Sequence, residues 1–166
     1  PDTDFIPKRK FRRLSRLSKM ALYTAHHASE YAEGLKIGAP IFCSRYGEIQ
    51  HTFQVLKSIY EKDLVSPMDF SYSVHNTGQG LFSILHEDTR PATVLSSRYD
   101  ALEQSLVKAY AQLHNGDEAV LVVYAEDELP AIFDSLDYRT FPLAFAFVVA
   151  KPEAGQKNLT ISHRPW

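Results

Sequence analysis

Residues 66–76 read Ser66-Pro67-Met68-Asp69-Phe70-Ser71-Tyr72-Ser73-Val74-His75-Asn76, and they open the segment, residues 66–127, that decides the fold. In this opening run, a proline followed by alternating aromatic and small polar residues favours extended backbone over helix. Asn76 then stands where it would cap a helix, and Gly78 and Gly80 would allow close backbone approach to that helix. The apolar face of the predicted helix comprises Leu81, Phe82, Ile84 and Leu85.

The rest of the segment alternates strand and helix. Residues 90–96 have a β-branched centre and predict a short strand that is buried on both faces. After a sharp turn, Asp100 and Glu103 form a capping-box pattern, and the helix that they begin ends at Asn115-Gly116. A wholly apolar strand is predicted for residues 119–124. The buried face of the helix is expected to contain Leu102, Leu106, Ala109 and Leu113.

The flanking sequence predicts further elements of both kinds. A first helix carries the core stripe Leu14, Leu17, Ala21, Ala25 and Ala28. Residues 40–44 predict a buried strand, and residues 47–62 predict a helix with Ile49, Phe53, Leu56 and Tyr60 on one face. Residues 141–150 form the most strand-like run of the chain, and residues 159–162 predict a short edge strand. This alternation predicts an α/β fold with a mostly parallel sheet and helices on both faces.

The order of these elements and several short motifs resemble the N-terminal half of the β-ketoacyl synthases, which have the thiolase fold. The resemblance covers residues 8–150 and includes Asn76 before a helix of small residues, Gly116-Asp117 and Ala125-Glu126. Further motifs are similar to short synthase-like proteins described as chain-length factors, including those of aryl polyene pigment clusters. These motifs are Ser-Arg-Tyr-Gly-Glu at residues 44–48, Ser66-Pro67 and Ser-Val-His-Asn at residues 73–76.

The resemblance implies a subunit without catalytic residues of its own. In β-ketoacyl synthases the turn after the strand at residues 90–96 carries a nucleophilic cysteine at a helix N-terminus. Here that place falls within residues 96–99, Ser-Ser-Arg-Tyr, which contain no cysteine. In those enzymes the two histidines and the lysine of decarboxylative condensation belong to the C-terminal half of the fold, which the resemblance does not lead us to expect in this chain. We therefore expect a chain-length-factor-like subunit that pairs with a catalytic β-ketoacyl synthase as a heterodimer and stabilises it.

The resemblance also assigns expected roles to individual residues. Phe70, Tyr72 and Phe82 are expected either in the core or at an acyl tunnel and subunit interface. His75 and Asn76 are expected beside the same tunnel, although Asn76 could equally cap its helix while His75 hydrogen-bonds backbone. In synthase dimers the strand before the nucleophile pairs antiparallel with its counterpart in the other subunit. This arrangement would place Ala92, Thr93 and Val94 in the seam of the heterodimer.

A basic cluster lies near the N-terminus, where seven Lys and Arg residues fall within residues 8–19. One interpretation is transient docking of an acidic acyl carrier protein, with Arg9, Arg12, Arg13 and Arg16 as the candidate residues. The other interpretation is the solvated face of the first helix. His26 and His27 are adjacent, so they point about 100° apart on a helix and cannot chelate one metal ion together.

Composition sets the remaining expectations. The chain has 166 residues, 45% of them hydrophobic and 23% charged, which is typical of a single globular domain, residues 1–166. A net charge of -2 gives no general attraction to nucleic acid, and no apolar run reaches the length of a membrane span. We expect a cytoplasmic protein with no cofactor and no metal. The sequence begins at Pro1 rather than methionine, which suggests that residues precede it.

Two other functions remain open from the sequence. A small independent acyltransferase could use Ser96 or Ser97 with a histidine base, or Cys43 as a thiol nucleophile. Cys43 lies inside a predicted strand with nothing nearby to lower its pKa, so a packing role competes with the catalytic one. The basic helix could also serve an adaptor for nucleic acid, whose binding would depend steeply on salt.

Overall fold

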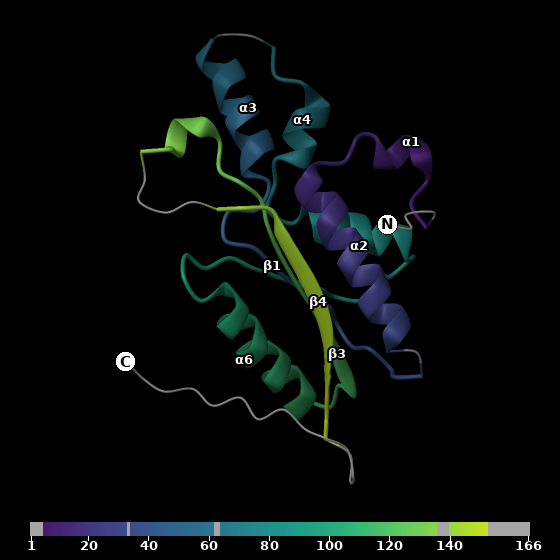
Figure 1. Cartoon of the computed structure of the whole chain (residues 1–166). Helices are drawn as coiled ribbons and strands as arrows, with labels where there is room; N and C mark the ends of the chain where they lie inside the picture. The colour runs from purple at the N-terminus through teal and green to yellow at the C-terminus, as the bar shows by residue number, and fades with distance from the viewer. Residues whose placement is uncertain (1–4, 33, 62–63, 136–139, 153–166) are drawn as a thin grey trace.

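The computed structural model describes residues 5–32, 34–61, 64–135 and 140–152, and they form a sheet covered by helices on both faces (Figure 1). The strands are β1 (Ile41–Cys43), β2 (Thr93–Leu95), β3 (Ala119–Glu126) and β4 (Leu143–Ala150), in the spatial order β2-β1-β3-β4. β1 pairs parallel with β2 and with β3, whereas β4 pairs antiparallel with β3 along all eight residues. The expected α/β fold with a mostly parallel sheet is confirmed. The edge strand expected at residues 159–162 lies outside the described residues.

Helices cover the two faces of the sheet unequally. On one face, α2 (Arg16–Tyr31) and α5 (Thr77–Leu85) pack on the sheet around Phe42, Leu121 and Val123. On the other face, α6 (Ala101–His114) packs on Ile41, Val120 and Val122. The remaining helical elements are α1 (Lys8–Phe11), α3 (Ile49–Tyr60), α4 (Pro67–Tyr72) and the short 3-10 helix η1 (Ala131–Phe133). Figure 1 shows α3 and α4 side by side at one end of the sheet, and the contacts between the two helices agree with this view.

The core stripe expected for the first helix is confirmed. Ser15 caps α2 because its side chain accepts a hydrogen bond from the backbone N–H of Ser18. Leu17, Ala21 and Ala25 then recur on the face of α2 that packs against the sheet, and all three are buried. The small side chains of the two alanines let the helix lie close to β3 and β4.

The prediction of extended backbone for residues 66–76 was wrong, because residues 67–72 form α4. Pro67 occupies the first turn of this helix, where a missing N–H costs nothing. The Ser66 side chain caps the helix by accepting from the N–H of Asp69 at 3.3 Å. A Ser-Pro pair followed by an acidic residue is therefore a helix start here, and it outweighs the alternating pattern.

Two other local expectations are corrected at helix starts. Asn76 and Asp100 do precede α5 and α6, but neither side chain makes a capping hydrogen bond. The carboxylate of Asp100 instead accepts from the hydroxyl of Ser97 and from the amide of Gln104. Gly78 packs at an ordinary distance from α2, because a Cβ there would lie 3.8 Å from the Cβ of Ala21, and Gly80 has open space.

The predicted buried faces also change. In α3 only Val55 is buried, whereas Leu56 and Tyr60 are 59% and 88% exposed, so the apolar face with helical spacing does not lie in the core. β2 is half-buried rather than buried on both faces, because it lies at the edge of the sheet. The most buried face of α6 is turned slightly from the expected one, and it comprises Ala101, Ser105, Ala109, Gln112 and Leu113.

Glu48 joins the starts of two helices. Its side chain is buried, and one carboxylate oxygen accepts hydrogen bonds from Ser15 at 2.7 Å and from Ser18 at 2.5 Å. Burial raises the pKa of Glu48, while the two serine hydroxyls oppose that rise. Because Glu48 immediately precedes α3, this contact fixes the start of α3 against the first turn of α2.

We predict that Glu48→Gln removes a pH-dependent loss of stability. A carboxyl whose pKa is raised on folding binds more protons in the folded state than in the unfolded state, so its contribution to stability falls as pH rises above its ordinary value of 4.5. Gln keeps an acceptor oxygen for both serines but cannot ionise. Unfolding free energies measured between pH 4.5 and 7.5 should therefore decline less with pH in Glu48→Gln than in wild type.

Glu48→Ala is the matched control for that prediction. It removes both the ionisable group and the acceptor, and it should be less stable than Glu48→Gln by about 1 to 3 kcal/mol at every pH, because the buried hydroxyl of Ser18 and the half-buried hydroxyl of Ser15 lose their acceptor. Parallel pH curves for wild type and Glu48→Gln would contradict the assignment.

Candidate functional site

The carboxyl ends of the three parallel strands meet at one edge of the sheet, where α/β proteins commonly bind ligands. The segments that follow the strands are linked to one another there. Ser96, after β2, donates a hydrogen bond from its hydroxyl to the carbonyl of Arg45 at 2.9 Å. The N–H of Arg45, after β1, donates to the carboxylate of Glu126 at the end of β3. Burial raises the pKa of Glu126, and the hydrogen bond from Arg45 opposes the rise.

The turn at residues 96–99 holds no nucleophile arranged for acyl transfer. Ser97 donates its hydroxyl hydrogen to the carboxylate of Asp100, and Ser96 donates to backbone. Among the described residues, neither serine is hydrogen-bonded to a histidine base. Tyr99 projects into solvent with 75% of its surface exposed, and the Arg98 guanidinium lies 5.0 Å from the centre of its ring.

Cys43 is a packing residue of β1. It is only 3% exposed, and its thiol donates to the carbonyl of Val123 at 3.3 Å. Burial raises the pKa of this thiol to about 11, which leaves very little nucleophilic thiolate at neutral pH. The geometry therefore favours the packing role over the catalytic one.

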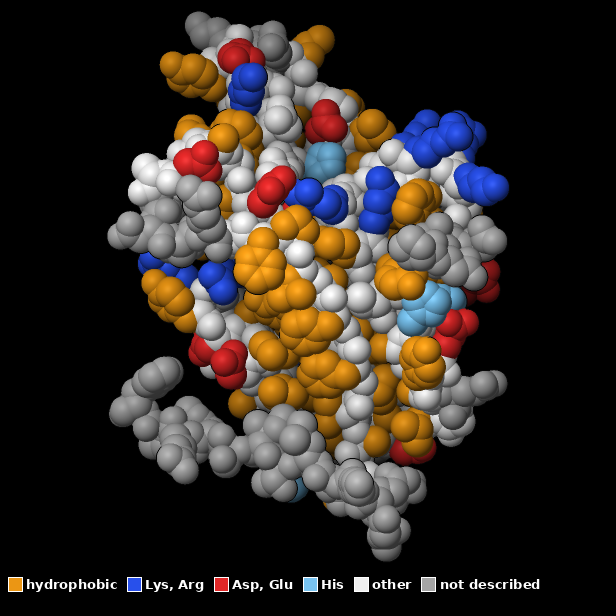
Figure 2. Space-filling view, in the orientation of Figure 1, with side chains coloured by type: hydrophobic (Ala, Val, Ile, Leu, Met, Phe, Trp, Pro, Cys, Tyr) orange, Lys and Arg blue, Asp and Glu red, His pale blue; other side chains and the backbone are white. Residues whose placement is uncertain are grey.

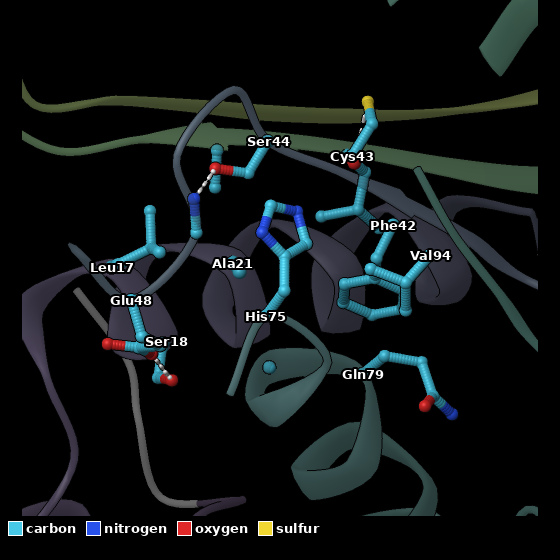
Figure 3. Close-up of a pocket in the computed structure, with 14 residues that line it drawn as sticks. Leu17, Ser18, Ala21, Phe42, Cys43, Ser44, Glu48, His75, Gln79 and Val94 are labelled. Carbon is cyan, nitrogen blue, oxygen red and sulfur yellow. Dashed lines mark hydrogen bonds between the residues drawn. The ribbon is translucent and has the colours of Figure 1, made fainter. Parts of the chain in front are cut away.

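His75 lines a small pocket between α2, β1 and α5 (Figure 3). The pocket holds about 30 Å³, the space of a single water molecule, and Ser44, Glu48 and Gln79 also line it. The Nε2 atom of His75 is buried and has no hydrogen-bond partner among the described residues. A Cβ on Gly47 would lie 2.4 Å from the Nδ1 atom of His75, so the imidazole occupies the space that only glycine leaves open.

The aromatic candidates separate into core and surface residues. Phe82 is 4% exposed, and its ring centre lies 5.5 Å from that of Phe42, so it belongs to the core. Tyr72 is half-buried at the edge of the same core, whereas Phe70 is 60% exposed on α4. Asn76 is exposed at the start of α5. The structure thus brings Tyr72 and Phe82 to one core cluster and leaves Phe70 at the surface.

Residues 92–94 lie at an open edge of the described sheet. The N–H of Thr93 donates to the carbonyl of Pro40 at 3.0 Å, and the carbonyl of Leu95 accepts from Ser44 at 3.2 Å, so both residues turn their backbone polar groups toward β1. Because these groups alternate along a strand, the N–H and C=O of Val94 point away from β1, toward the open edge. Ala92 is half-buried beside them.

An apolar surface on α3, α4 and their connection was missed by the sequence analysis. It consists of apolar side chains that are all more than two-fifths exposed: Leu56, Ile59, Tyr60, Leu64, Met68 and Phe70. The signal was present in the sequence, because α3 carries more apolar residues than one helix face can hide. We call this set the α3–α4 surface.

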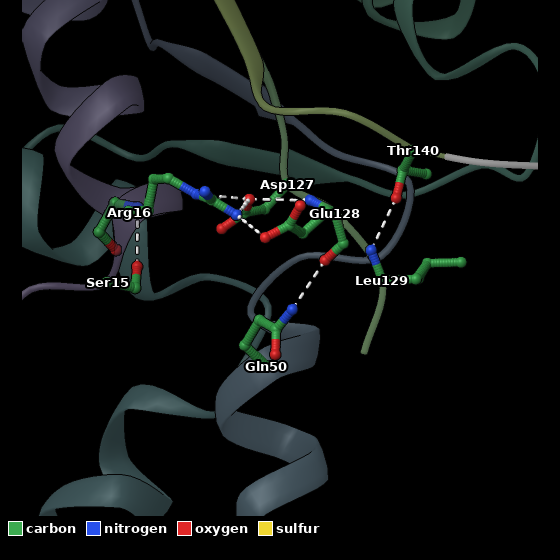
Figure 4. Close-up of polar contacts among 8 residues, drawn as sticks. Ser15, Arg16, Gln50, Asp127, Glu128, Leu129 and Thr140 are labelled. Atoms are coloured by element: carbon green, nitrogen blue, oxygen red, sulfur yellow. Dashed lines mark hydrogen bonds and ion pairs between the residues drawn. The ribbon is translucent and has the colours of Figure 1, made fainter. Parts of the chain in front are cut away.

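The basic candidates are also divided by the structure. Arg9, Arg12 and Arg13 are exposed near α1, where Figure 2 shows a group of blue side chains. Arg16 instead forms ion pairs with Asp127 and Glu128, each at 2.6 Å, and Gln50 donates to the Glu128 carbonyl beside them (Figure 4). Arg16 therefore ties the start of α2 to the end of β3 and is the least available of the four for docking.

The described part of the chain holds no group of three or more His, Cys, Asp or Glu side chains that could bind a metal ion. None of its helices combines the length and the apolarity that crossing a bilayer requires.

Comparison with known proteins places the fold. The chain is similar to a chain of the complex of a ketosynthase with its chain length factor from Xenorhabdus doucetiae, with a TM-score of 0.81 and 26% identity over 90% of this chain and 63% of that one. The ishigamide ketosynthase/chain length factor shares the fold at a TM-score of 0.75 and 16% identity, over 93% of this chain and 48% of that one. A β-ketoacyl synthase from Burkholderia phymatum STM815 shares the fold at a TM-score of 0.61 and 18% identity, over 81% of this chain and 36% of that one.

The chain thus spans less than two thirds of the length of each of these structures. No curated protein matches it by sequence. A family model described as the N-terminal domain of β-ketoacyl synthases matches residues 1–165. The parallel strands with their antiparallel neighbour, the helices on both faces and this match over nearly the whole length lead to one conclusion: the chain belongs to the β-ketoacyl synthase family, as its N-terminal domain, and has a thiolase-like fold.

Proposed function

We propose that the chain acts as a chain-length-factor-like subunit, which forms a heterodimer with a catalytic β-ketoacyl synthase and stabilises it. The observation that carries the proposal is the combination of a synthase fold with a nucleophile turn that lacks cysteine. The similarity to a complex of a ketosynthase with its chain length factor supports the same role. The partner would supply the nucleophile and the decarboxylation machinery.

Synthesis of a fatty-acid or polyketide-type product, of the aryl polyene class, is the finer part of the proposal. It is supported by the short motifs at residues 44–48 and 73–76. Such a subunit would work in the cytoplasm, where its carrier-bound substrates are made.

The proposal treats the isolated chain as catalytically inactive. The three candidate nucleophiles of the sequence analysis are all engaged elsewhere in the structure: Cys43 is buried, Ser96 donates its hydroxyl to backbone and Ser97 donates its hydroxyl to Asp100. Loss of even one oxyanion donor typically lowers an acyl-transfer rate by about 10² to 10³. The rival function, an independent acyltransferase, would need one of these groups to become free.

We predict that the isolated chain forms no acyl adduct and performs no condensation. Mass spectrometry of the chain after incubation with acyl-loaded carrier protein should find Ser96, Ser97 and Cys43 unmodified. Alkylation of Cys43 only after denaturation serves as the control for detection. A stable acyl adduct that disappears in Ser97→Ala or in Cys43→Ala would establish the independent acyltransferase instead.

The proposed seam of the heterodimer is the open edge of β2. Thr93, Val94 and Leu95 carry no charge, whereas strands that stay exposed are commonly protected by lysine, proline or a bulge. The backbone groups of Val94 would pair with a strand of the synthase and continue the sheet across the two subunits. Ala92 and Thr93 would lie at the same boundary.

We predict that Val94→Pro weakens the complex with the synthase, because proline removes the outward N–H that would bond the partner strand. An acceptor left unpaired in the buried seam costs about 1 to 3 kcal/mol, which weakens binding about 5- to 150-fold. Affinity can be measured by titration of the co-expressed partner, with the unfolding temperature of each variant confirming that it folds.

Val94→Ala is the matched control, since it shortens the same side chain but keeps the N–H. Thr93→Pro is the opposite control. It breaks the internal bond to Pro40 and should lower the stability of the chain itself. Equal affinity of Val94→Pro and Val94→Ala would place the seam elsewhere.

The α3–α4 surface gives the subunit a way to influence product length. Apolar side chains that remain this exposed are typical of a surface covered by a partner. We propose that Phe70 and Tyr72 approach the acyl pocket of the partner, and that His75 and Asn76 hold the turn that positions them. Phe82 lies within the core and contributes to this site only through packing.

We predict that Phe70→Ala and Tyr72→Ala shift the distribution of product lengths made by the complex, with a smaller effect on the rate. Ile132→Ala, an exposed apolar residue on η1, is the control and should leave the products unchanged. Phe82→Ala should instead destabilise the chain by about 3 to 5 kcal/mol, because it opens a cavity in the core. Unchanged products for both Phe70→Ala and Tyr72→Ala would leave the subunit a stabilising role alone.

We also propose that an acyl carrier protein docks transiently on Arg9, Arg12 and Arg13. Their exposure and their like charge support this proposal, because complementary charge speeds the encounter with an acidic protein. Arg16 would contribute only if its ion pairs with Asp127 and Glu128 opened.

A further inference from the structure

Three elements, the segment around Phe5, α2 and the end of α5, meet at a histidine cluster. The ring of His26, on α2, stacks on Phe5 with centres 3.8 Å apart and an angle of 11°. The ring of His86, directly after α5, lies 5.4 Å from His26 and 4.3 Å from Phe82. Next to Phe5, Ile6 is 2% exposed in the main core. The cluster thus joins the segment around Phe5 to both helices of that face of the sheet.

Few of the described groups around the cluster could stabilise an added positive charge. The Nδ1 atom of His26 and the Nε2 atom of His27 are buried, and neither has a hydrogen-bond partner within the part of the chain that the structure describes. The carboxylate of Glu30 lies 3.4 Å from the Nε2 atom of His26 and 3.0 Å from the Nδ1 atom of His27, so two imidazoles share one exposed carboxylate. Asp88 is the other acidic group that acts on His86, and it is bound by Arg90 at 2.6 Å.

We propose that this cluster is an acid-sensitive latch, which holds residues 5–6 and the end of α5 against α2 while His86 is neutral. Protonation of His86 would place a positive charge beside the ring of His26 at the junction of α2 and α5. The partly buried site offers that charge the carboxylate of Glu30, which His26 and His27 already share, and the carboxylate of Asp88, which Arg90 already binds. The stack of Phe5 on His26 and the packing of Ile6 beneath it would then open.

The direction of the pH effect follows from His86. Burial lowers the pKa of His86, and the neighbouring His26 lowers it further, while Asp88 and Glu30 oppose the shift. A base whose pKa is lowered on folding binds fewer protons when folded. Its contribution to stability is therefore present at neutral pH and is lost as the pH falls below the ordinary value of 6.5.

Hydrogen exchange of the full chain at pH 7.5 and pH 5.5, corrected for the intrinsic pH dependence of exchange, tests the latch. Peptides that cover residues 5–6 and 82–88 should open roughly two- to fivefold more at pH 5.5 in wild type, as expected for one partly exposed charge contact. His86→Gln should remove this difference. His114→Gln is the matched control, because His114 lies on α6, on the other face of the sheet. The same acid-induced opening in His86→Gln, or none in wild type, would overturn the proposal.

Titration of the His86 imidazole by nuclear magnetic resonance provides a test that does not depend on a variant of that residue. In wild type the midpoint should lie below 6.5, and in His26→Gln it should rise because the neighbouring charge is absent. A wild-type midpoint at or above 6.5, or one that His26→Gln leaves unchanged, would show that the two rings do not act together and would end the proposal.

Discussion

The structure depends on the pairing of β3, which is hydrogen-bonded to β1 on one side and to β4 on the other. Its residues from Ala119 to Val123 are at most 1% exposed, so both faces and both edges of the strand are removed from water. Leu121 and Val123 point to the α2 and α5 face, whereas Val120 and Val122 point to α6. One strand therefore links the two halves of the core, and a polar residue in its middle would be costly on either face.

That burial also governs the polar groups at the end of the sheet. Glu126, the last residue of β3, and Asp127, directly after it, remain buried, so each requires a partner. The N–H of Arg45 donates a hydrogen bond to Glu126, and the guanidinium of Arg16 forms an ion pair with Asp127. Together with Glu48 and its two serines, these contacts fix α2, β1, β3 and α3 relative to one another. In this chain the edge that serves catalysis in many α/β enzymes is occupied by structural hydrogen bonds.

The described chain buries its core, but it exposes backbone groups and large apolar side chains at its surface. β2 leaves backbone groups of Val94 directed outward, and the α3–α4 surface exposes large apolar side chains. Open strand edges and exposed apolar side chains are typical of surfaces that another protein covers, which agrees with the proposed role as one subunit of a synthase complex.

The sequence by itself determined the fold class, the core stripe of α2 and the three apolar strands around Cys43, Val122 and Phe147, because apolar periodicity is a local property. The sequence alone also shows that no cysteine follows β2, because residue identity does not depend on the fold. It misjudged α4, since capping by Ser66 and the proline at the first helical position outweighed the alternating pattern. Only the tertiary structure decided which apolar residues are buried: α3 lies at the end of the sheet and has little surface to pack against, so Leu56 and Tyr60 remain exposed. It also decided the pairing of Arg16 with Asp127, the place of His75 over Gly47 and the direction of the Val94 backbone, because each depends on segments that are distant in the sequence and meet only in the folded chain.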